Sequence, residues 1–333
     1  MSATIDDVAA RAGVSTATVS RALRGLPHVS AGARARVLQA AAELDYVAAP
    51  TASRLATGRT GAVAVVTAYL GTWFFGQVLS GIERVLRAAE YDVLLYALPD
   101  ADAQDEFLSR MPLRRRVDGV VLLAVTLTPA QQEAMVSLDL PMVAVGDPLA
   151  QSFSVGIDNE AAARTATNHL INLGHRRIAM IGDSGARFST PGQRRRGFLG
   201  AMRAAGLEVP GGYLVEGGYT VSGGASAMAE LLSLPQPPSA VFAQSDEMAA
   251  GAMQAIRRIG LRCPDDVSIV GFDDHELAAV LDLTTMAQPA QLRGEIAAEH
   301  LLEALAEART ATGSGRELAH TRLVVRSSTG PPA

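Results

Sequence analysis

The chain has 333 residues, enough for more than one domain, and its 48% hydrophobic and 19% charged residues are typical of a soluble globular protein. The first residues, MSATIDDVAARAG, are acidic where a signal peptide is basic, and no apolar run approaches the roughly 20 residues that span a membrane. The single cysteine, Cys263, excludes a disulfide within the chain and a metal site made of cysteine pairs. We therefore expect a cytoplasmic protein that does not contact a membrane.

The basic residues bear on function because, histidine aside, all 29 of them are arginine. The absence of lysine excludes a P-loop nucleotide site, a pyridoxal Schiff base and a lysine nucleophile. The motifs G-x-G-x-x-G, H-E-x-x-H and G-x-S-x-G are also absent, and the six histidines show no metal-ligand spacing. We expect no enzymatic activity, no cofactor and no bound metal ion.

Charge is distributed unevenly along the chain. Seven arginines and four acidic residues give the first 60 residues a net charge of +3, which leaves −8 for the remainder of a chain whose net charge is −5. A basic segment on an acidic protein indicates that the segment contacts a polyanion.

Residues 1–47 are predicted to form three short helices, followed by a polar linker over residues 48–60. The first helix lies in TIDDVAARA, where Thr4 and Asp7 have the spacing of a capping box, and it ends at Gly13. The third helix starts near Ser30. Its apolar side chains recur at helical spacing at Val37, Leu38, Ala41 and Leu44.

The second helix, from Ser15 as its N-cap to about Leu23, has two different faces. At about 100° per residue, one arc contains Val19, Ala22 and Leu23. The opposite arc contains Thr16, Ala17, Ser20, Arg21 and Arg24. Together with the spacing of Ala9, Gly13 and Val19, this is typical of a helix-turn-helix whose hydroxyls and arginines enter the major groove of DNA. The alternative is that the hydroxyl groups only cap a solvated helix.

Residues 61–333 are predicted to form two lobes of parallel sheet. Apolar strand-like runs alternate with amphipathic helical stretches, which indicates βαβ units, and the length exceeds one sheet. We expect lobe 1 to span about 61–157 and 288–316, and lobe 2 about 158–287 and 317–330. The final residues, STGPPA, are predicted to be disordered.

Polar side chains follow several of the predicted strands. Acidic residues stand at these positions: Asp147, Asp183, Asp246, Asp273 and Asp274. Ligands of open α/β sheets bind beyond the carboxyl ends of strands, so we expect a binding site there. The alternative is that each acid caps the following helix.

Three adjacent aromatic residues, in GTWFFGQ, follow the first strand of this region although only 5% of the chain is aromatic. Sugars present flat C–H faces and paired hydroxyls, and aromatic rings with charged or amide groups recognise them. Trp73, Phe74 and Phe75 are therefore candidate effector-binding residues. One of Phe74 and Phe75 is alternatively a core residue, whereas Trp73 is interpreted as a ring that stacks on the ligand.

The segment TIDDVAARAGVSTATVSRAL…VSAGARARVLQAAAELDYV resembles the DNA-binding segment of the lactose/galactose repressor (LacI/GalR) family. The blocks HLINLGHRRIAMIGD, QRRRGFLGAM, AVFAQSDEMAAGAMQAI, VSIVGFDD and LTTMAQP resemble the same family in the same order. The resemblance implies an α/β protein with an N-terminal helix-turn-helix and a two-lobed, doubly wound sensor similar to periplasmic binding proteins. It also implies a transcriptional regulator, usually a repressor, that binds a palindromic double-stranded operator as a homodimer.

The resemblance assigns roles in DNA binding. Thr16 and Ala17 occupy the positions that read bases, and Arg21 adds a base contact. Residues expected at or near phosphates are Thr4, Ser15, Thr18 and Ser20. Leu55 matches the hinge leucine that enters the minor groove, with packing on the partner subunit as the alternative. Ala48, Ala49 and Pro50 depart from the Pro-Asn of the family, which puts the start of the hinge helix in doubt.

The resemblance also assigns an effector site. Arg194 matches the effector-binding arginine of the family, Asp273 its acidic partner, and Asp246 the aspartate of an Asn-Asp pair whose asparagine is replaced here by Ser245. We expect a sugar effector whose binding closes the lobes. A nucleoside or purine effector, and a binding protein without a DNA function, are the alternatives. Induction and co-repression both remain open.

Overall fold

The computed structural model describes residues 3–23, 27–46, 59–68, 70–149, 152–183, 189–307 and 315–333. The chain forms two compact units. The first, Met1–Gly61 with Arg115–Asp118, is called the N-terminal unit, and the second, Ala62–Arg114 with Gly119–Ala333, is called the body.

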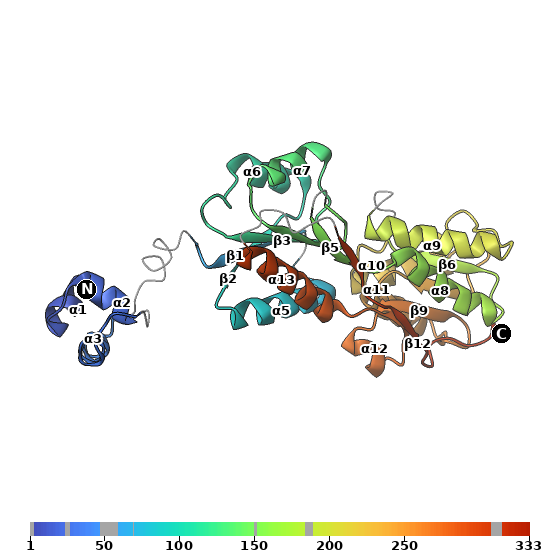
Figure 1. Ribbon diagram of the computed structural model, residues 1–333. Coiled ribbons are helices and arrows are strands. Elements are labelled where there is room, and N and C mark those ends of the chain that lie inside the picture. The colour runs from blue at the N-terminus through green and yellow to red at the C-terminus, as the bar shows by residue number, and fades with distance from the viewer. Residues whose placement is uncertain are drawn as a thin grey trace. The chain divides into compact units, whose positions relative to one another are not determined.

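The N-terminal unit contains the three predicted helices, α1 (Ile5–Ala12), α2 (Thr16–Leu23) and α3 (Ala31–Glu43) (Figure 1). The predicted helix ends are confirmed. Thr4 and Asp7 form a capping box, Gly13 ends α1 with a φ of 64°, and the Ser30 side chain caps α3. The hydroxyl of Ser15 accepts a hydrogen bond from the Thr18 N–H at 3.3 Å at the start of α2.

A small apolar core joins the three helices. It consists of Val8, Ala9, Ala12, Val19, Ala22, Val37, Ala40 and Ala41. Leu38 shares the helical spacing of these apolar residues but does not join the core, because it is 51% exposed. The buried face of α3 passes through Val37, Ala40 and Ala41, and Leu38 lies about 100° around the helix from Val37.

Lobe 1 of the body contains a six-stranded sheet in the order β11-β5-β4-β3-β1-β2, and every pair of neighbours is parallel. The strands are β1 (Ala62–Thr67), β2 (Asp92–Ala97), β3 (Gly119–Leu123), β4 (Met142–Val145), β5 (Phe153–Gly156) and β11 (Arg316–Leu318). The helices of this lobe are α5 (Trp73–Ala88), α6 (Ala101–Arg110), α7 (Pro129–Val136) and α13 (Ala290–Ala306). Figure 1 shows α5 and α13 on one face of the sheet and α6 and α7 on the other.

Lobe 2 contains a second six-stranded sheet, in the order β12-β10-β9-β8-β6-β7, in which only β12 is antiparallel to its neighbour. The strands are β6 (Ile178–Ile181), β7 (Leu214–Val215), β8 (Ala240–Ala243), β9 (Ser268–Asp273), β10 (Thr284–Ala287) and β12 (Arg322–Val324). The helices are α8 (Asn159–Asn172), α9 (Thr190–Ala204), α10 (Val221–Leu232), α11 (Asp246–Arg258) and α12 (Glu276–Val280).

The central strands of lobe 2 are buried on both faces, which explains their uninterrupted apolar sequences. Successive side chains of a strand point to opposite faces. Ile181 and Val241 accordingly pack in one core cluster with α10 and α11, whereas Met180 and Phe242 pack in another with α8 and α9. No helix in the described part of the chain is long and apolar enough to cross a membrane.

The chain passes between the lobes after β5, after β10 and between β11 and β12. The last passage lies close to the boundary expected at about 316–317. All of Arg316–Leu318 pairs with Ser154–Gly156 of β5, so the chain leaves lobe 1 only after Leu318.

The C-terminal residues are ordered, so the prediction of a disordered STGPPA is wrong. The hydroxyl of Ser328 donates to the carbonyl of Ile269 at 2.6 Å. The carbonyl of Gly330 lies 2.9 Å from Nε2 of His175, and the hydroxyl of Thr329 lies 2.9 Å from Nε2 of His169. Both histidines therefore hold the C-terminal segment against lobe 2.

Helices α5 and α13 cross at very close range in lobe 1. A Cβ atom on Gly81 would lie 2.1 Å from the carbonyl oxygen of Gln291, and one on Gly294 would lie 2.1 Å from the carbonyl oxygen of Val78. The crossing therefore requires glycine on both helices.

We predict that Gly81→Ala destabilises the protein by about 1–3 kcal/mol, because the added methyl group collides with the backbone of α13. Gly76→Ala in the same helix is the control, since a Cβ there has nothing within 4 Å. The control should be neutral or should stabilise the protein by up to about 1 kcal/mol. Urea unfolding of both variants measures the difference, and equal effects would refute the close crossing.

Candidate functional site

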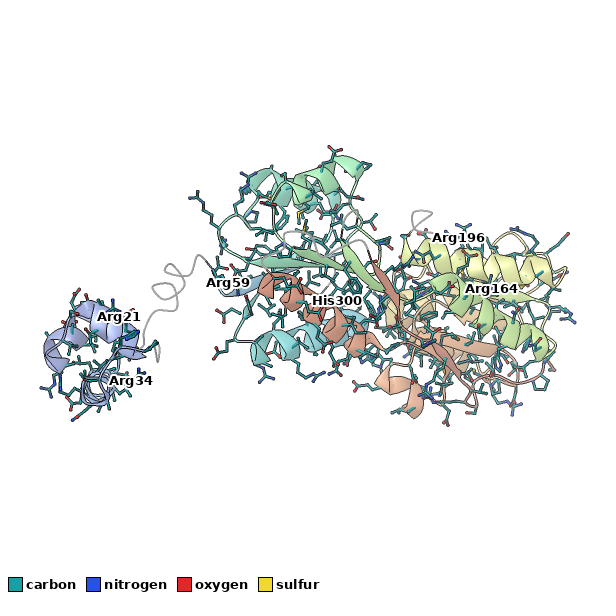
Figure 2. The ribbon with its side chains drawn as sticks, in the orientation of Figure 1. Arg21, Arg34, Arg59, Arg164, Arg196 and His300 are labelled. Carbon is teal, nitrogen blue, oxygen red and sulfur yellow. The ribbon has the colours of Figure 1, made fainter. Side chains whose placement is uncertain are left out.

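Helix α2 presents the predicted DNA-reading face to solvent. Thr16, Ala17 and Arg21 are exposed, while Val19 and Ala22 are buried, as the two predicted arcs require. Figure 2 shows the Arg21 side chain extending from this helix. The helix can therefore approach a groove without losing its contacts to α1 and α3.

Some of the hydroxyl groups predicted near phosphates also form hydrogen bonds within the N-terminal unit. Oγ1 of Thr4 donates to a carboxylate oxygen of Asp7 at 2.7 Å, and Oγ of Ser15 lies 2.9 Å from Oγ1 of Thr18. Ser20 is half-buried on α2. The predicted contacts of Arg24 and Leu55, and the unusual hinge start at Ala48, Ala49 and Pro50, lie outside the described residues.

Two further arginines of the N-terminal unit hold the ends of its helices. Nε of Arg36 donates to the carbonyl of Ala12 at 3.2 Å, and a terminal nitrogen of Arg34 donates to the carbonyl of Ala22 at 3.2 Å. They satisfy carbonyl groups that a helix end leaves unpaired. The positive charge of the unit is thus partly structural, whereas Arg21 stands on the exposed face.

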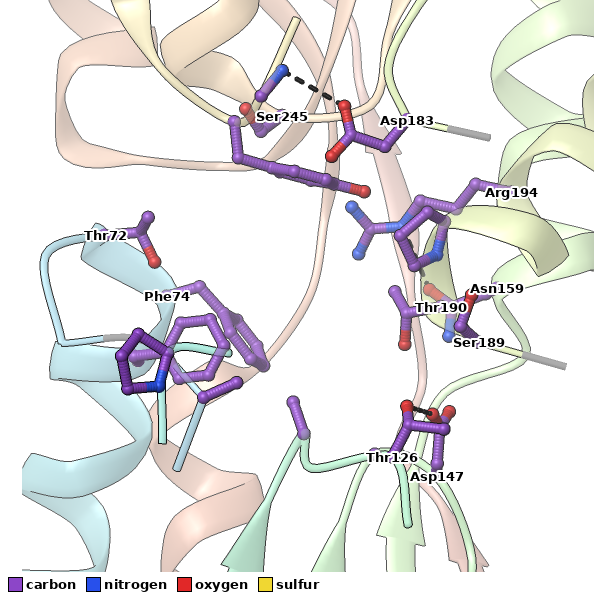
Figure 3. Close-up of a pocket in the computed structure, with 18 of the residues that line it drawn as sticks. Thr72, Phe74, Thr126, Asp147, Asn159, Asp183, Ser189, Thr190, Arg194 and Ser245 are labelled. Atoms are coloured by element: carbon purple, nitrogen blue, oxygen red, sulfur yellow. Dashed lines mark hydrogen bonds between the residues drawn. The ribbon is translucent and has the colours of Figure 1, made fainter. Parts of the chain in front are cut away.

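A cavity of about 820 Å³ lies between the two lobes of the body. Figure 3 shows Thr72, Phe74, Thr126 and Asp147 on the lobe 1 side and Asn159, Asp183, Arg194 and Ser245 on the lobe 2 side. Its volume suits a small organic ligand. The site that the strand ends predict is therefore present as a cavity.

Arg194 is a buried side chain of the cavity wall with several partners. It is buried, its Nε donates to Oδ1 of Asn159 at 3.0 Å, and a terminal nitrogen donates to the carbonyl of Gln244. The other terminal nitrogen lies 3.9 Å from Oδ1 of Asp273. The guanidinium carbon lies 3.5 Å from the centre of the Phe272 ring, an arrangement that favours a cation.

Asp273, at the end of β9, is the acidic partner that the sequence predicts. Burial raises the pKa of its carboxyl group to about 7, although the Arg194 guanidinium opposes that shift. Its φ of 121° is a strained value for a residue other than glycine, and such strain concentrates at functional sites.

A short hydrogen-bonded chain leads from Asp273 into lobe 1. The amide of Gln288 donates to Asp273, and Arg293 on α13 donates to the amide oxygen of Gln288 at 2.7 Å. Burial lowers the pKa of Arg293 to about 10. Its Nε has no hydrogen-bond partner among the described residues, so the buried side chain is only partly satisfied.

Phe74 and Phe75 line the cavity, with ring centres 5.5 Å apart and planes nearly perpendicular at 87°. Both rings also pack against the core of lobe 1. Trp73 is not among the residues that line the cavity, and its stacking on the effector stays a prediction. Its ring lies 5.0 Å from that of His275.

Ser245 and Asp246 differ in position although they are adjacent. Ser245 lines the cavity and caps α11 through its hydroxyl group. Asp246 does not line the cavity, and its assignment as an effector-binding residue stays a prediction. Its carboxylate accepts from the hydroxyl of Thr285 at 2.6 Å and from the N–H of His275 at 2.7 Å, and burial raises its pKa well above the ordinary value.

Of the other acidic residues at strand ends, two line the cavity and one does not. Asp147 and Asp183 line the cavity, where Asp147 accepts from Thr126 at 3.0 Å and Asp183 accepts from the N–H of Gly218 at 3.1 Å (Figure 3). Asp274 instead pairs with Arg326 at 2.8 Å. None of the five acids is the N-cap of a helix described in the body, so the capping alternative is wrong for them.

Several cavity residues have no local sequence signal. Asn159 and Glu247 are the first and second residues of helices, and Gln288 and Arg293 flank the passage from lobe 2 to α13. Each would be interpreted from sequence as an ordinary polar helix-end residue. Only the convergence of the two lobes brings them to one cavity.

Comparison with protein families gives two matches. Residues 4–49 match bacterial regulatory proteins of the lacI family, and residues 167–329 match the periplasmic binding protein-like domain. The chain is 36% identical to the HTH-type transcriptional repressor CytR of Escherichia coli (strain K12), covering 98% of this chain and 96% of the relative. It is 33% identical to the ribose operon repressor of the same organism, covering 92% of this chain and 94% of that protein.

Solved structures give the same result. The lac repressor dimer bound to operator and the anti-inducer ONPF is similar with a TM-score of 0.86 and 27% identity, covering 99% of this chain and 100% of that one. A complex of the transcriptional regulator CelR with cellobiose is similar with a TM-score of 0.72 and 32% identity, covering 98% and 99%. The similarity therefore includes both the N-terminal unit and the body.

Because the pKa of Asp273 is raised in the folded protein, the stability of the protein depends on pH. An unfolded aspartate has a pKa of about 3.9, so between that value and about 7 the folded protein holds a proton that the unfolded chain has released. This contribution to stability is present at acid pH and is lost as the pH rises through 7.

We predict that the melting temperature of Asp273→Asn, which cannot ionise at this position, rises relative to that of the unsubstituted protein as the pH increases from about 5 to 8. Melting temperatures of both proteins across this range provide the test. A difference that stays constant, or that shrinks with rising pH, would contradict the raised pKa.

Proposed function

Because this chain belongs to the LacI family of bacterial regulatory proteins, we propose that its cavity binds a neutral, hydroxyl-rich effector that controls operator binding. Its relatives are transcriptional repressors and not enzymes. The observation that carries the proposal is the chemistry of the cavity wall, which combines aromatic rings with an excess of hydrogen-bond acceptors.

The charges of the cavity favour a neutral effector over an anion. Two guanidinium groups, of Arg194 and Arg293, line it together with six carboxyl groups: Asp100, Asp147, Asp183, Glu216, Glu247 and Asp273. Burial raises the pKa of both Asp147 and Asp273, which favours their neutral forms. Even if both were protonated, four carboxylates would face two cations, so a phosphate or carboxylate group on the effector would meet net repulsion.

A sugar offers the groups that the cavity wall can bind. The carboxylates and the Asn159 amide can accept hydrogen bonds from sugar hydroxyl groups, and Arg194 can donate hydrogen bonds to them. The Phe74 and Phe75 rings offer apolar faces to the C–H groups of the sugar. The relatives named above include a ribose operon repressor and a regulator in complex with cellobiose, which supports a saccharide. A sugar is therefore the first candidate.

A nucleoside is the second candidate. The perpendicular pair of phenylalanines and Tyr219 could hold a flat base, while the carboxylates bind the ribose hydroxyls. Such a ligand is also neutral and hydroxyl-rich, so it meets the same constraint of charge.

For DNA binding, the proposal assigns Thr16, Ala17 and Arg21 to base edges in the major groove of a palindromic operator bound by a homodimer. The remaining assignments from the family resemblance are Thr4, Ser15, Thr18 and Ser20 at phosphates, with Arg24 and the hinge residue Leu55. The exposure of Thr16, Ala17 and Arg21 supports the reading face.

Calorimetric titration of the intact protein with cellobiose, D-ribose, uridine and glucose 6-phosphate tests the effector class. We expect at least one neutral compound to bind and glucose 6-phosphate not to bind. Tight binding of glucose 6-phosphate with no binding of the neutral compounds would overturn the proposal.

We predict that Arg194→Ala weakens binding of that neutral compound by about 10- to 100-fold, because a charge-assisted hydrogen bond is lost. Arg195→Ala is the matched control, since the neighbouring side chain does not line the cavity. It should leave the dissociation constant unchanged. Equal affinities of the Arg194 variant and the unsubstituted protein would remove Arg194 from the site.

We predict that Arg21→Ala weakens binding to a palindrome upstream of the gene by about 1–3 kcal/mol and reduces the preference for that sequence over competitor DNA. Arg11→Ala removes the same charge from an arginine that pairs with Glu43, and it should retain the preference. Gel shifts at several salt concentrations provide the measurement. If the intact chain shows no sequence preference, a binding protein without a DNA function becomes the better interpretation.

A further inference from the structure

The N-terminus of α5 in lobe 1 obtains a cap from lobe 2. Thr72, at the N-cap position, makes no side-chain capping hydrogen bond. Instead, the N–H of Trp73 donates to Oε1 of Glu247 at 3.3 Å. Glu247 is the second residue of α11, so a carboxylate of one lobe satisfies a helix N-terminus of the other. A negative charge at this position is electrostatically favourable.

A second contact between the lobes lies beside the first. The Trp73 ring stands 5.0 Å from the ring of His275 with an angle of 37° between their planes. The His275 ring is fixed, because its Nδ1 accepts from the N–H of Leu277 at 2.9 Å and its backbone N–H donates to Asp246 at 2.7 Å. Trp73 therefore meets a rigid surface of lobe 2 and not a mobile side chain.

Glu247 also lines the cavity, unlike Trp73 and His275. A carboxylate has two oxygens, and only Oε1 is used by the cap of α5. The same side chain can therefore bind lobe 1 through Oε1 and accept a hydrogen bond from a hydroxyl group of the effector through its other oxygen.

We propose that Trp73, Glu247 and His275 form a latch between the lobes, in which Trp73 and His275 are positioning residues that orient the Glu247 carboxylate for the effector. The proposal rests on the function proposed above for the ligand-binding step, whereas the latch itself rests on the contacts among these three residues. A carboxylate whose orientation is fixed by neighbouring residues loses less conformational freedom when it binds the effector, which reduces the ordering cost of binding.

Trp73 is the only tryptophan of the chain, so its fluorescence reports on the latch directly. In the intact protein without ligand, we expect Glu247→Ala and His275→Ala to shift the emission to longer wavelength and to increase acrylamide quenching by about twofold. Glu247→Gln retains an acceptor oxygen and should stay close to the unsubstituted protein, whereas Glu247→Asp is too short and should behave like the alanine variant. Glu276→Ala, on the exposed side of α12, is the control.

Circular dichroism of each variant establishes that it is folded, and the glutamine variant separates loss of the contact from loss of the fold. Unchanged emission and quenching in both folded alanine variants would overturn the latch. So would an equal change in the Glu276 control.

The positioning role has a separate readout. With the neutral compound that binds best among cellobiose, D-ribose and uridine, His275→Ala should weaken binding by about tenfold although His275 does not line the cavity. The Glu276 control should bind normally. Normal binding by the His275 variant refutes the positioning role. Failure of the unsubstituted protein to bind any of the three refutes the proposed function and leaves the fluorescence test of the latch intact.

Discussion

The burial of the Arg194 guanidinium is the constraint on which the rest of the cavity depends. A buried charge is tolerated only when it is paired and its hydrogen-bond donors are used. Arg194 meets this demand with Asn159 at the start of α8, the Gln244 carbonyl after β8 and Asp273 at the end of β9. Because these partners come from three separate elements of lobe 2, the needs of one side chain fix how those elements converge on the cavity.

The connection to lobe 1 follows from the same arrangement. Asp273 accepts from Gln288, and Gln288 accepts from Arg293 of α13, so polar contacts continue through the segment where the chain passes from β10 to α13. Glu247 and Trp73 connect the lobes again at the start of α5. The polar contacts of the cavity wall thus continue into both of these connections between the lobes.

The sequence predicts those features that depend on local patterns. The caps at Thr4 and Ser30, the buried arc of α2 and the strand ends at Asp147, Asp183 and Asp273 follow from residue type and spacing. Contacts between distant segments are not predictable in this way. Asp246 has the residue type of a ligand contact but binds Thr285 and His275, and Trp73 has the type of a stacking ring but meets His275. Gln288 and Arg293 could not be predicted, because only the folded passage between the lobes brings them to the cavity.

We propose that occupancy of the cavity changes the affinity of the protein for its operator. Such coupling is reciprocal, so effector and operator must alter the binding of each other by the same factor. The most direct measurement is the anisotropy of a labelled operator duplex titrated with the protein, with and without a saturating neutral compound that binds the cavity. A change in the dissociation constant of about fivefold or more, matched by an equal change in the compound's affinity when operator is present, is the expected result. An operator affinity that is the same with the cavity empty and filled would contradict the account.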